Sequence, residues 1–72
     1  MHRYTVILEY DAEAGGYGAI VPALPGCASM GDTVEAALAN VREAIALHVA
    51  ALEADGEAVP EDRAVLVTTV AA

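Results

Sequence analysis

The chain has 72 residues, a length that suits one domain, and 57% of them are hydrophobic although Trp and Phe are absent. Disordered chains are poor in apolar residues, so this composition argues against disorder. Eleven acidic residues against three arginines and no lysine give a net charge of −8. This balance disfavours nucleic-acid binding, which needs clustered Lys and Arg. A basic protein is the electrostatic complement, and plain solubility is the alternative explanation of the charge.

Self-association is expected from size and composition together. A domain this short buries only about 60% of the surface that its unfolded chain exposes, and its core rarely supplies more than roughly 3–5 kcal/mol. The single Cys27 rules out an internal disulfide. So much small apolar surface should leave a contact patch on a monomer, and we expect a homodimer or homotetramer.

No targeting or spanning segment is predicted. The chain does not begin with a basic stretch followed by an apolar one, so we expect no secretory signal. Its apolar runs fall short of the roughly 20 residues that cross a bilayer. With one unpaired thiol, a cytoplasmic location without a membrane partner is expected.

The first part of the chain predicts two strands joined as a hairpin. Residues 3–10 alternate as a strand does, with apolar side chains on both faces, which suits cover by a helix on one side and in part by a partner on the other. Residues 11–16 form a polar, glycine-bearing connector of hairpin length, and a second β-prone run covers 17–21. Pro22 cannot donate a ladder hydrogen bond, so it ends this strand or lies at a sheet edge.

A tight turn and a third strand follow. The sequence Leu24-Pro25-Gly26-Cys27 fits a type II turn, because proline fixes φ at the second position and glycine accepts positive φ at the third. Residues 27–30 are long enough to return beside the second strand.

One long helix is predicted over residues 34–54, which contain no Pro or Gly. Thr33 is a suitable N-cap, and Gly56 is placed to end the helix in a left-handed cap. At about 100° per residue, one stripe is expected to face the sheet, and it comprises Val34, Leu38, Val41, Ile45, His48, Val49 and Leu52. Leu47 lies nearly opposite that stripe, which makes it a candidate for an inter-subunit contact.

A fourth strand is predicted over residues 63–70, where β-branched residues recur. The expected fold is therefore α+β, with a three-stranded antiparallel meander, one long helix on one face and a fourth strand, in the order β-β-β-α-β. We expect the edge of the sheet to be free for pairing with a second copy.

The side chains that could carry chemistry favour binding over catalysis. Cys27 has no evident base, so we interpret it as a packed apolar residue. His48 lies on the core stripe and is more readily a packed aromatic side chain than a ligand. The carboxylates of Glu9, Asp11 and Glu13 lie at a solvated hairpin without a pocket to tune them. We therefore predict no enzyme activity, no metal site and no cofactor.

The chain resembles the HicB-like antitoxin family over nearly its whole length. The most specific parts are the Leu-Pro-Gly-Cys turn and the Gly-Asp-Thr helix start, in that order and spacing. The segments that carry the resemblance are Glu9 to Gly16, Tyr17 to Pro22, Leu24 to Cys27, Gly31 to Thr33 and Ala37 to Ile45.

The resemblance implies a partial RNase H-like fold that lacks the catalytic carboxylates of RNase H. It also implies a function, since HicB-like proteins bind and block a small basic ribonuclease toxin of the HicA-like kind, an mRNA interferase. Many members continue into a DNA-binding segment, whereas this chain is expected to be one domain over residues 1–72 without such a segment, and thus without nucleic-acid binding by this chain alone.

Two functions remain open at this point. One is neutralisation of a toxin by protein–protein contact, and the other is a self-associating domain of different purpose that binds a small ligand between subunits near residues 17–27. The predicted partner or oligomer contacts are Tyr17, Pro22, Leu24, Pro25, Gly26 and Leu47.

Overall fold

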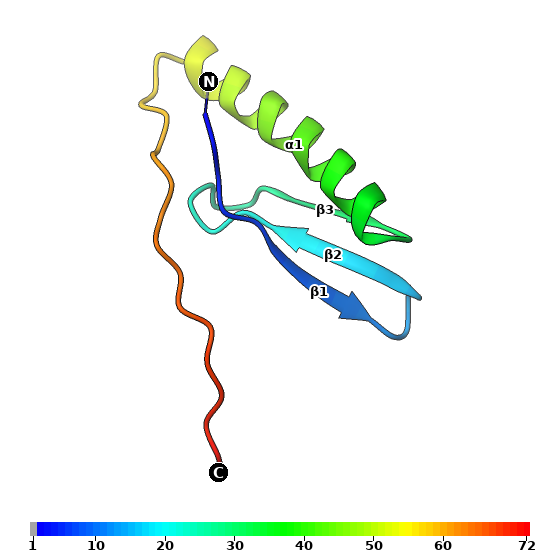
Figure 1. The fold of residues 1–72 in the computed structure, drawn as a ribbon. Coiled ribbons are helices and arrows are strands. Elements are labelled where there is room, and N and C mark those ends of the chain that lie inside the picture. The colour runs from blue at the N-terminus through cyan, green and yellow to red at the C-terminus, as the bar shows by residue number, and fades with distance from the viewer. Residues whose placement is uncertain (1) are drawn as a thin grey trace.

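A computed structural model describes residues 2–72, and its elements follow the predicted order through the helix. They are β1 (Ile7–Asp11), β2 (Gly16–Ile20), β3 (Ala28–Gly31) and α1 (Val34–Ala54). The three strands pair antiparallel in the order β1-β2-β3, and α1 lies across one face of the sheet (Figure 1). The predicted α+β fold, an antiparallel meander with one long helix on one face, is confirmed.

The strand ends differ from the prediction most at the N-terminus. β1 begins at Ile7, not at Arg3, because residues 4 and 5 bond to the chain near Pro60 and Asp62 instead of to β2. β2 and β3 are each displaced by one residue from the predicted ranges. The difference is small, since the amide of Val21 still donates to the carbonyl of Cys27 at 3.2 Å and extends the ladder.

The predicted turn between β2 and β3 is present. The amide of Cys27 donates to the carbonyl of Leu24 at 2.9 Å, and Gly26 has a φ of 83°, as a type II turn requires of its third residue. A further bond from the Leu24 amide to the carbonyl of Val21, 3.0 Å long, folds the loop back on itself. The loop is thereby compact, with its apolar side chains turned toward the core.

Local signals fix both ends of α1. The hydroxyl of Thr33 accepts a hydrogen bond from the Ala36 amide at 3.1 Å, which confirms the predicted N-cap. At the other end Gly56 has a φ of 70° and donates to the carbonyl of Glu53, while the Glu57 amide donates to the carbonyl of Leu52. This pair of bonds is a Schellman motif, so the predicted glycine cap is also confirmed.

The core lies between α1 and the sheet. The predicted helix stripe supplies Val41 and Val49, which are buried, while Ile45 and Leu52 are partly buried. Leu38 is 41% exposed, because it borders an open groove described below. The buried cluster comprises Ala19, Val21, Leu24, Cys27, Ala37, Val41 and Val49.

The predicted fourth strand is not formed within the described residues. Residues 63–70 have no strand partner, and Figure 1 shows this segment leaving the body as an extended tail (orange to red). A strand is stable only when its backbone groups find a partner, and this segment runs away from the sheet without meeting one. The RNase H-like arrangement, which depends on that strand, stays a prediction.

Candidate partner-binding surfaces

The side of α1 that faces away from the sheet presents small apolar residues around one leucine. Leu47 is 68% exposed, and residues three, four and seven positions away on a helix share its face. We define the outer helix face as Glu43, Leu47, Ala50, Ala51 and Ala54, all of them exposed. The alanines leave Leu47 as the one large apolar side chain of this face.

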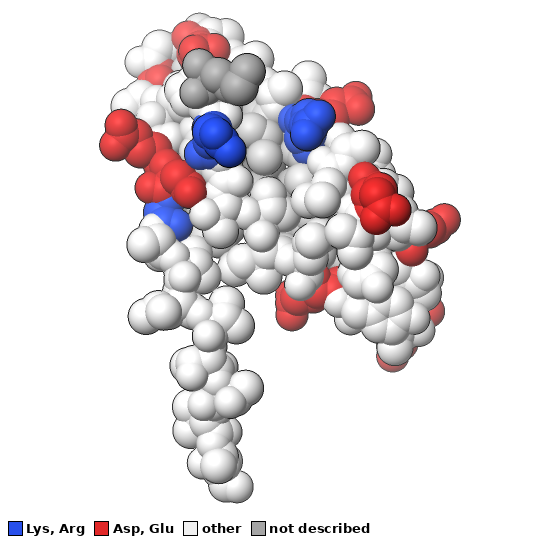
Figure 2. Space-filling view, in the orientation of Figure 1, with Lys and Arg blue, Asp and Glu red and all other residues white. Residues whose placement is uncertain are grey.

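Negative charge surrounds the body of the molecule. All eleven carboxylate side chains are exposed. They gather at the β1–β2 hairpin, at the start of α1 and around its C-terminal end, and Figure 2 shows them along the rim of one view, with the tail almost uncharged. The body therefore presents a negative field from several sides to an approaching molecule.

The loop between β2 and β3 exposes only its tip. Pro25 and Gly26 are exposed and Pro22 is half-buried. Leu24 is fully buried, so its side chain supports the loop from inside and presents no surface to a partner. Tyr17, on β2, is half-buried, with its ring centroid 5.3 Å from that of Tyr10.

The predicted contact residues thus occupy separate elements. Tyr17 lies on β2, four of them lie on the loop, and Leu47 lies on the outer helix face, away from the sheet. They do not converge on one site.

The sheet face opposite α1 is open. Ala19 is buried beneath α1, so its neighbours in β2 point to the other side. On that side Ile20 is 43% exposed and Met30 is 56% exposed, with Gly18 directly opposite Met30. Glu9 lies on this face as well, opposite Gly18, so the face is mixed in character, and no element of residues 2–72 covers it.

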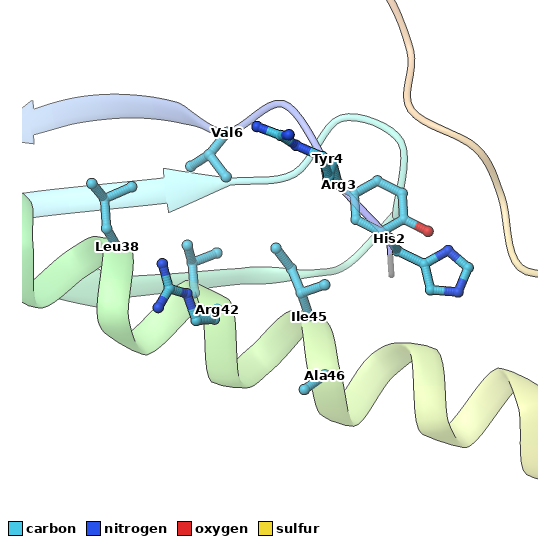
Figure 3. A pocket seen from close by; sticks show the side chains of 9 residues that line it. His2, Arg3, Tyr4, Val6, Leu38, Arg42, Ile45 and Ala46 are labelled. Carbon is cyan, nitrogen blue, oxygen red and sulfur yellow. The ribbon is translucent and has the colours of Figure 1, made fainter.

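A groove of about 710 Å³ separates the N-terminal segment from α1. Its floor is apolar, and two of the three arginines of the chain, Arg3 and Arg42, stand on its two sides (Figure 3). The lining residues are His2, Arg3, Tyr4, Val6, Leu38, Val41, Arg42, Ile45 and Ala46. Sequence reasoning missed this groove, since the arginines are scattered along the chain and only the fold brings them together.

The N-terminal segment is joined to the chain that follows α1. The hydroxyl of Tyr4 donates to the carbonyl of Pro60 at 2.6 Å. Thr5 donates to the carboxylate of Asp62 twice, from its amide at 2.8 Å and from its hydroxyl at 2.7 Å. These hydrogen bonds hold the pKa of Asp62 below its ordinary value. We call this cluster the junction.

The side chains weighed for chemistry do not assemble. Cys27 is buried, and burial raises the pKa of its thiol. His48 is half-buried on α1. Within residues 2–72 no group of three or more His, Cys, Asp or Glu side chains is placed to hold a metal ion. No helix of that same range has the length and apolarity to cross a membrane.

Comparison with known proteins identifies relatives over nearly the whole chain. The sequence profile of the HicB-like antitoxin of bacterial toxin–antitoxin systems matches residues 4–71. A UPF0150 protein of Thermoplasma acidophilum is 44% identical over 66 residues, which are 92% of this chain and 94% of that protein. A UPF0150 protein of Synechocystis is 45% identical over 62 residues, 86% of this chain and 77% of the relative. No solved structure matches significantly.

Proposed function

Because this chain belongs to the HicB-like antitoxin family of bacterial toxin–antitoxin systems, we propose that it neutralises a small basic mRNA-interferase toxin by protein–protein contact. The observation that carries the proposal is the combination of this family with eleven exposed carboxylates and a net charge of −8. A ribonuclease must present a basic surface to RNA. A negative protein surface competes for that same surface.

The outer helix face is the contact that we assign to the toxin. Binding energy in protein interfaces concentrates in a few large side chains near the centre of the patch, inside a rim that excludes water. Leu47 has this position, since it stands alone among alanines with Glu43 one turn away. The small alanines let a partner approach the helix closely, and Glu43 adds a carboxylate to the face.

The proposed role requires binding and no turnover. Cys27 is buried and no metal-binding cluster is found within residues 2–72. We therefore assign the protein a stoichiometric function in the cytoplasm, where the mRNA substrate of such a toxin is found. A HicA-like ribonuclease is the expected partner.

The test is co-expression with the product of an adjacent small basic reading frame. We expect the two proteins to co-purify and growth to be restored in cells that the basic protein alone arrests. Substitution L47R should weaken the purified complex by at least about tenfold, since it places a positive charge and a bulky side chain at the centre of the contact. Substitution A46R, one residue away and off the outer helix face, is the matched control and should change the affinity little.

Failure of the pair to co-purify, with toxicity unrelieved, would reject the antitoxin function. A complex that forms equally well with L47R and A46R would keep that function and would show that the outer helix face is not the contact with the toxin.

A second candidate is a self-associating domain that holds a small ligand. The groove favours it, because an apolar floor between Arg3 and Arg42 suits a molecule with an apolar body and a negative group. Octanoate is a suitable probe. It should raise the melting temperature of the wild type and leave that of the R42Q variant unchanged, and equal shifts for both proteins would exclude this ligand class.

A further inference from the structure

We propose that the protein forms a strand-exchanged dimer, in which the tail of each copy, Arg63–Val70, pairs with the free edge of β1 in the other copy. This inference does not depend on the toxin. It rests on an extended apolar segment, an open sheet edge and an uncovered groove, all present in every copy.

The tail has the composition of a strand and lacks the partner that a strand needs. Leu66 is 96% exposed, and Val67 and Val70 are exposed nearly as much. Within residues 2–72 no backbone hydrogen bond ties residues 63–72 to the body. A contiguous set of exposed apolar side chains marks a contact surface. The family match extends to residue 71, so the tail belongs to the shared domain.

The junction directs the tail away from its own sheet. Tyr4 and Thr5 bond to Pro60 and Asp62, so the two segments lie side by side there. Beyond the junction the N-terminal segment bends into β1, whereas the tail continues in an extended path away from the body, so the two segments diverge (Figure 1). No Gly or Pro follows Pro60, so the tail has no residue suited to a sharp turn back.

Only one edge of the sheet can receive the tail. The outer side of β3 is occupied by α1, because the side-chain amide of Asn40 donates to the carbonyl of Met30 at 2.7 Å. Gly31 lies so close to the backbone at Ala36 and Ala37 that it has no room for a Cβ. β1 is the other edge strand, and no strand of residues 2–72 pairs with its outer side. An extended segment added there gains main-chain hydrogen bonds by β-augmentation.

Charge favours a second copy of the chain as the occupant. Two molecules of charge −8 repel each other, so a contact between copies has to keep their like charges apart. Residues 64–72 contain no charged side chain. The edge strand carries Glu9 and Asp11, and Arg63 at the start of the incoming tail is opposite to them in sign. An acidic partner protein would gain nothing from that edge.

The groove offers an apolar surface to side chains of the incoming tail. It lies on the helix side of the segment that leads into β1, with Val6 and Leu38 exposed to it. A strand beside β1 would project alternate side chains toward α1, over that apolar floor. The remaining side chains would extend the open sheet face near Ile20. A two-fold axis makes the exchange reciprocal, so each copy gives one strand and receives one.

The first test is the mass in solution. Light scattering at micromolar concentration should give twice the monomer mass of 7.3 kDa for the full chain. A chain ending at Arg63 keeps the junction and should be monomeric, with helix content by circular dichroism unchanged. A monomeric full chain, or a dimer that survives the truncation, would overturn the proposal.

Cross-linking separates exchange between copies from folding back within one copy. Glu9 is the middle residue of β1, and Leu66 lies near the middle of the tail, so these positions face each other in either strand direction. In a C27A background, E9C chains carrying a size tag are mixed with untagged L66C chains and oxidised. V65C and V67C replace L66C in parallel samples, so that both faces of the tail are sampled.

Exchange predicts a disulfide-linked heterodimer of tagged and untagged chains for at least one tail position, and a covalent dimer for the double variant E9C/L66C. In the control, S29C replaces the tail cysteine. Ser29 lies in β3, at the other edge of the sheet from β1, so this mixture should give no heterodimer. Internal closure of the double variant, without any heterodimer from the mixtures, would show that the tail returns to its own sheet and would refute the exchange.

Discussion

At the scale of single residues, Gly31 is the position where one methyl group should cost most. A Cβ there would lie 2.6 Å from the Ala36 carbonyl carbon and 2.8 Å from the Cα of Ala37. Both are helix backbone atoms that cannot move aside, so β3 and the first turn of α1 would have to separate. We expect G31A to lower the free energy of unfolding by about 1–3 kcal/mol, as overpacking does.

The matched control for G31A is G18A in the neighbouring strand. A Cβ at Gly18 meets nothing nearer than the Glu9 carbonyl oxygen at 4.0 Å. Urea denaturation of the two variants should therefore differ in midpoint at similar slope. Equal stability of G31A and G18A would mean that the contact between β3 and α1 is looser than described.

Cys27 provides a second prediction at this scale. Its side chain is 6% exposed, and burial raises the pKa of its thiol. Because the thiolate is the reactive form, modification by an aromatic disulfide reagent at neutral pH should be slow in the folded protein. The double variant C27A/A28C moves the thiol to an exposed neighbour and should react at least about tenfold faster, as thiolate access predicts. Equal rates would contradict the buried position.

The sequence predicted backbone conformation in the loop better than side-chain direction. Proline and glycine at the two central positions of the turn require a type II geometry, and the structure has its closing hydrogen bond. Leu24 was expected at a contact surface, yet it is fully buried. Its direction depends on how the loop folds over Val41 and Val49, and no local pattern in the sequence encodes that packing.

At the scale of elements, the start of α1 depends on one hydroxyl. The Oγ1 atom of Thr33 accepts from the Ala36 amide at 3.1 Å. We expect T33A to destabilise the protein by about 1 kcal/mol, the usual cost of a lost N-cap. T33S keeps the acceptor and is the control, with a stability close to that of the wild type. Thermal unfolding followed by circular dichroism at 222 nm measures the difference, and equal losses for both variants would exclude the cap as its cause.

The junction should depend on pH through Asp62. Hydrogen bonds from Thr5 lower the pKa of this carboxyl from its ordinary 3.8 in the folded chain. A lowered folded pKa means that the contribution to stability is complete above the unfolded value and is lost as the pH falls through the folded one. The wild type should therefore exceed D62A in stability near neutral pH, and this difference should shrink below pH 3.8.

The control for D62A is E61A, which removes the same charge from the adjacent residue and leaves the bonds to Thr5 in place. Chemical denaturation of both variants from neutral to acid pH separates hydrogen bonding from general charge effects. If E61A follows the same pH dependence as D62A, the junction does not tie the tail to the N-terminal segment.

The elements were predictable to the extent that their signals are local. The helix was predicted over residues 34–54 and is observed over the same range, because Thr33, Gly56 and an uninterrupted run between them determine it. The tail has equally good strand residues, yet it forms no strand in a single copy. Strand formation depends on meeting a free sheet edge, and no local pattern in the tail encodes which edge it meets.

At the scale of the whole molecule, the two proposed associations should respond to salt in opposite ways. Two copies of net charge −8 repel each other, and most of their proposed contact is apolar, made by residues 64–70 of the tail and the floor of the groove. A basic toxin is attracted by that same charge. Salt shortens the screening length from about 10 Å at 0.1 M to about 3 Å at 1 M, so it weakens repulsion and attraction alike.

We therefore expect self-association to tighten or hold constant as sodium chloride rises from about 0.1 M to about 1 M, while the toxin complex weakens by about tenfold or more, chiefly through slower association. Sedimentation equilibrium measures the first quantity, and stopped-flow mixing with the co-purified basic protein measures the second. The truncated chain ending at Arg63 separates the two, because it should lose self-association and keep the salt-sensitive toxin complex. If salt dissociated the copies as readily as it dissociated the toxin, charged groups would hold the dimer together, and the uncharged tail could not be its main contact.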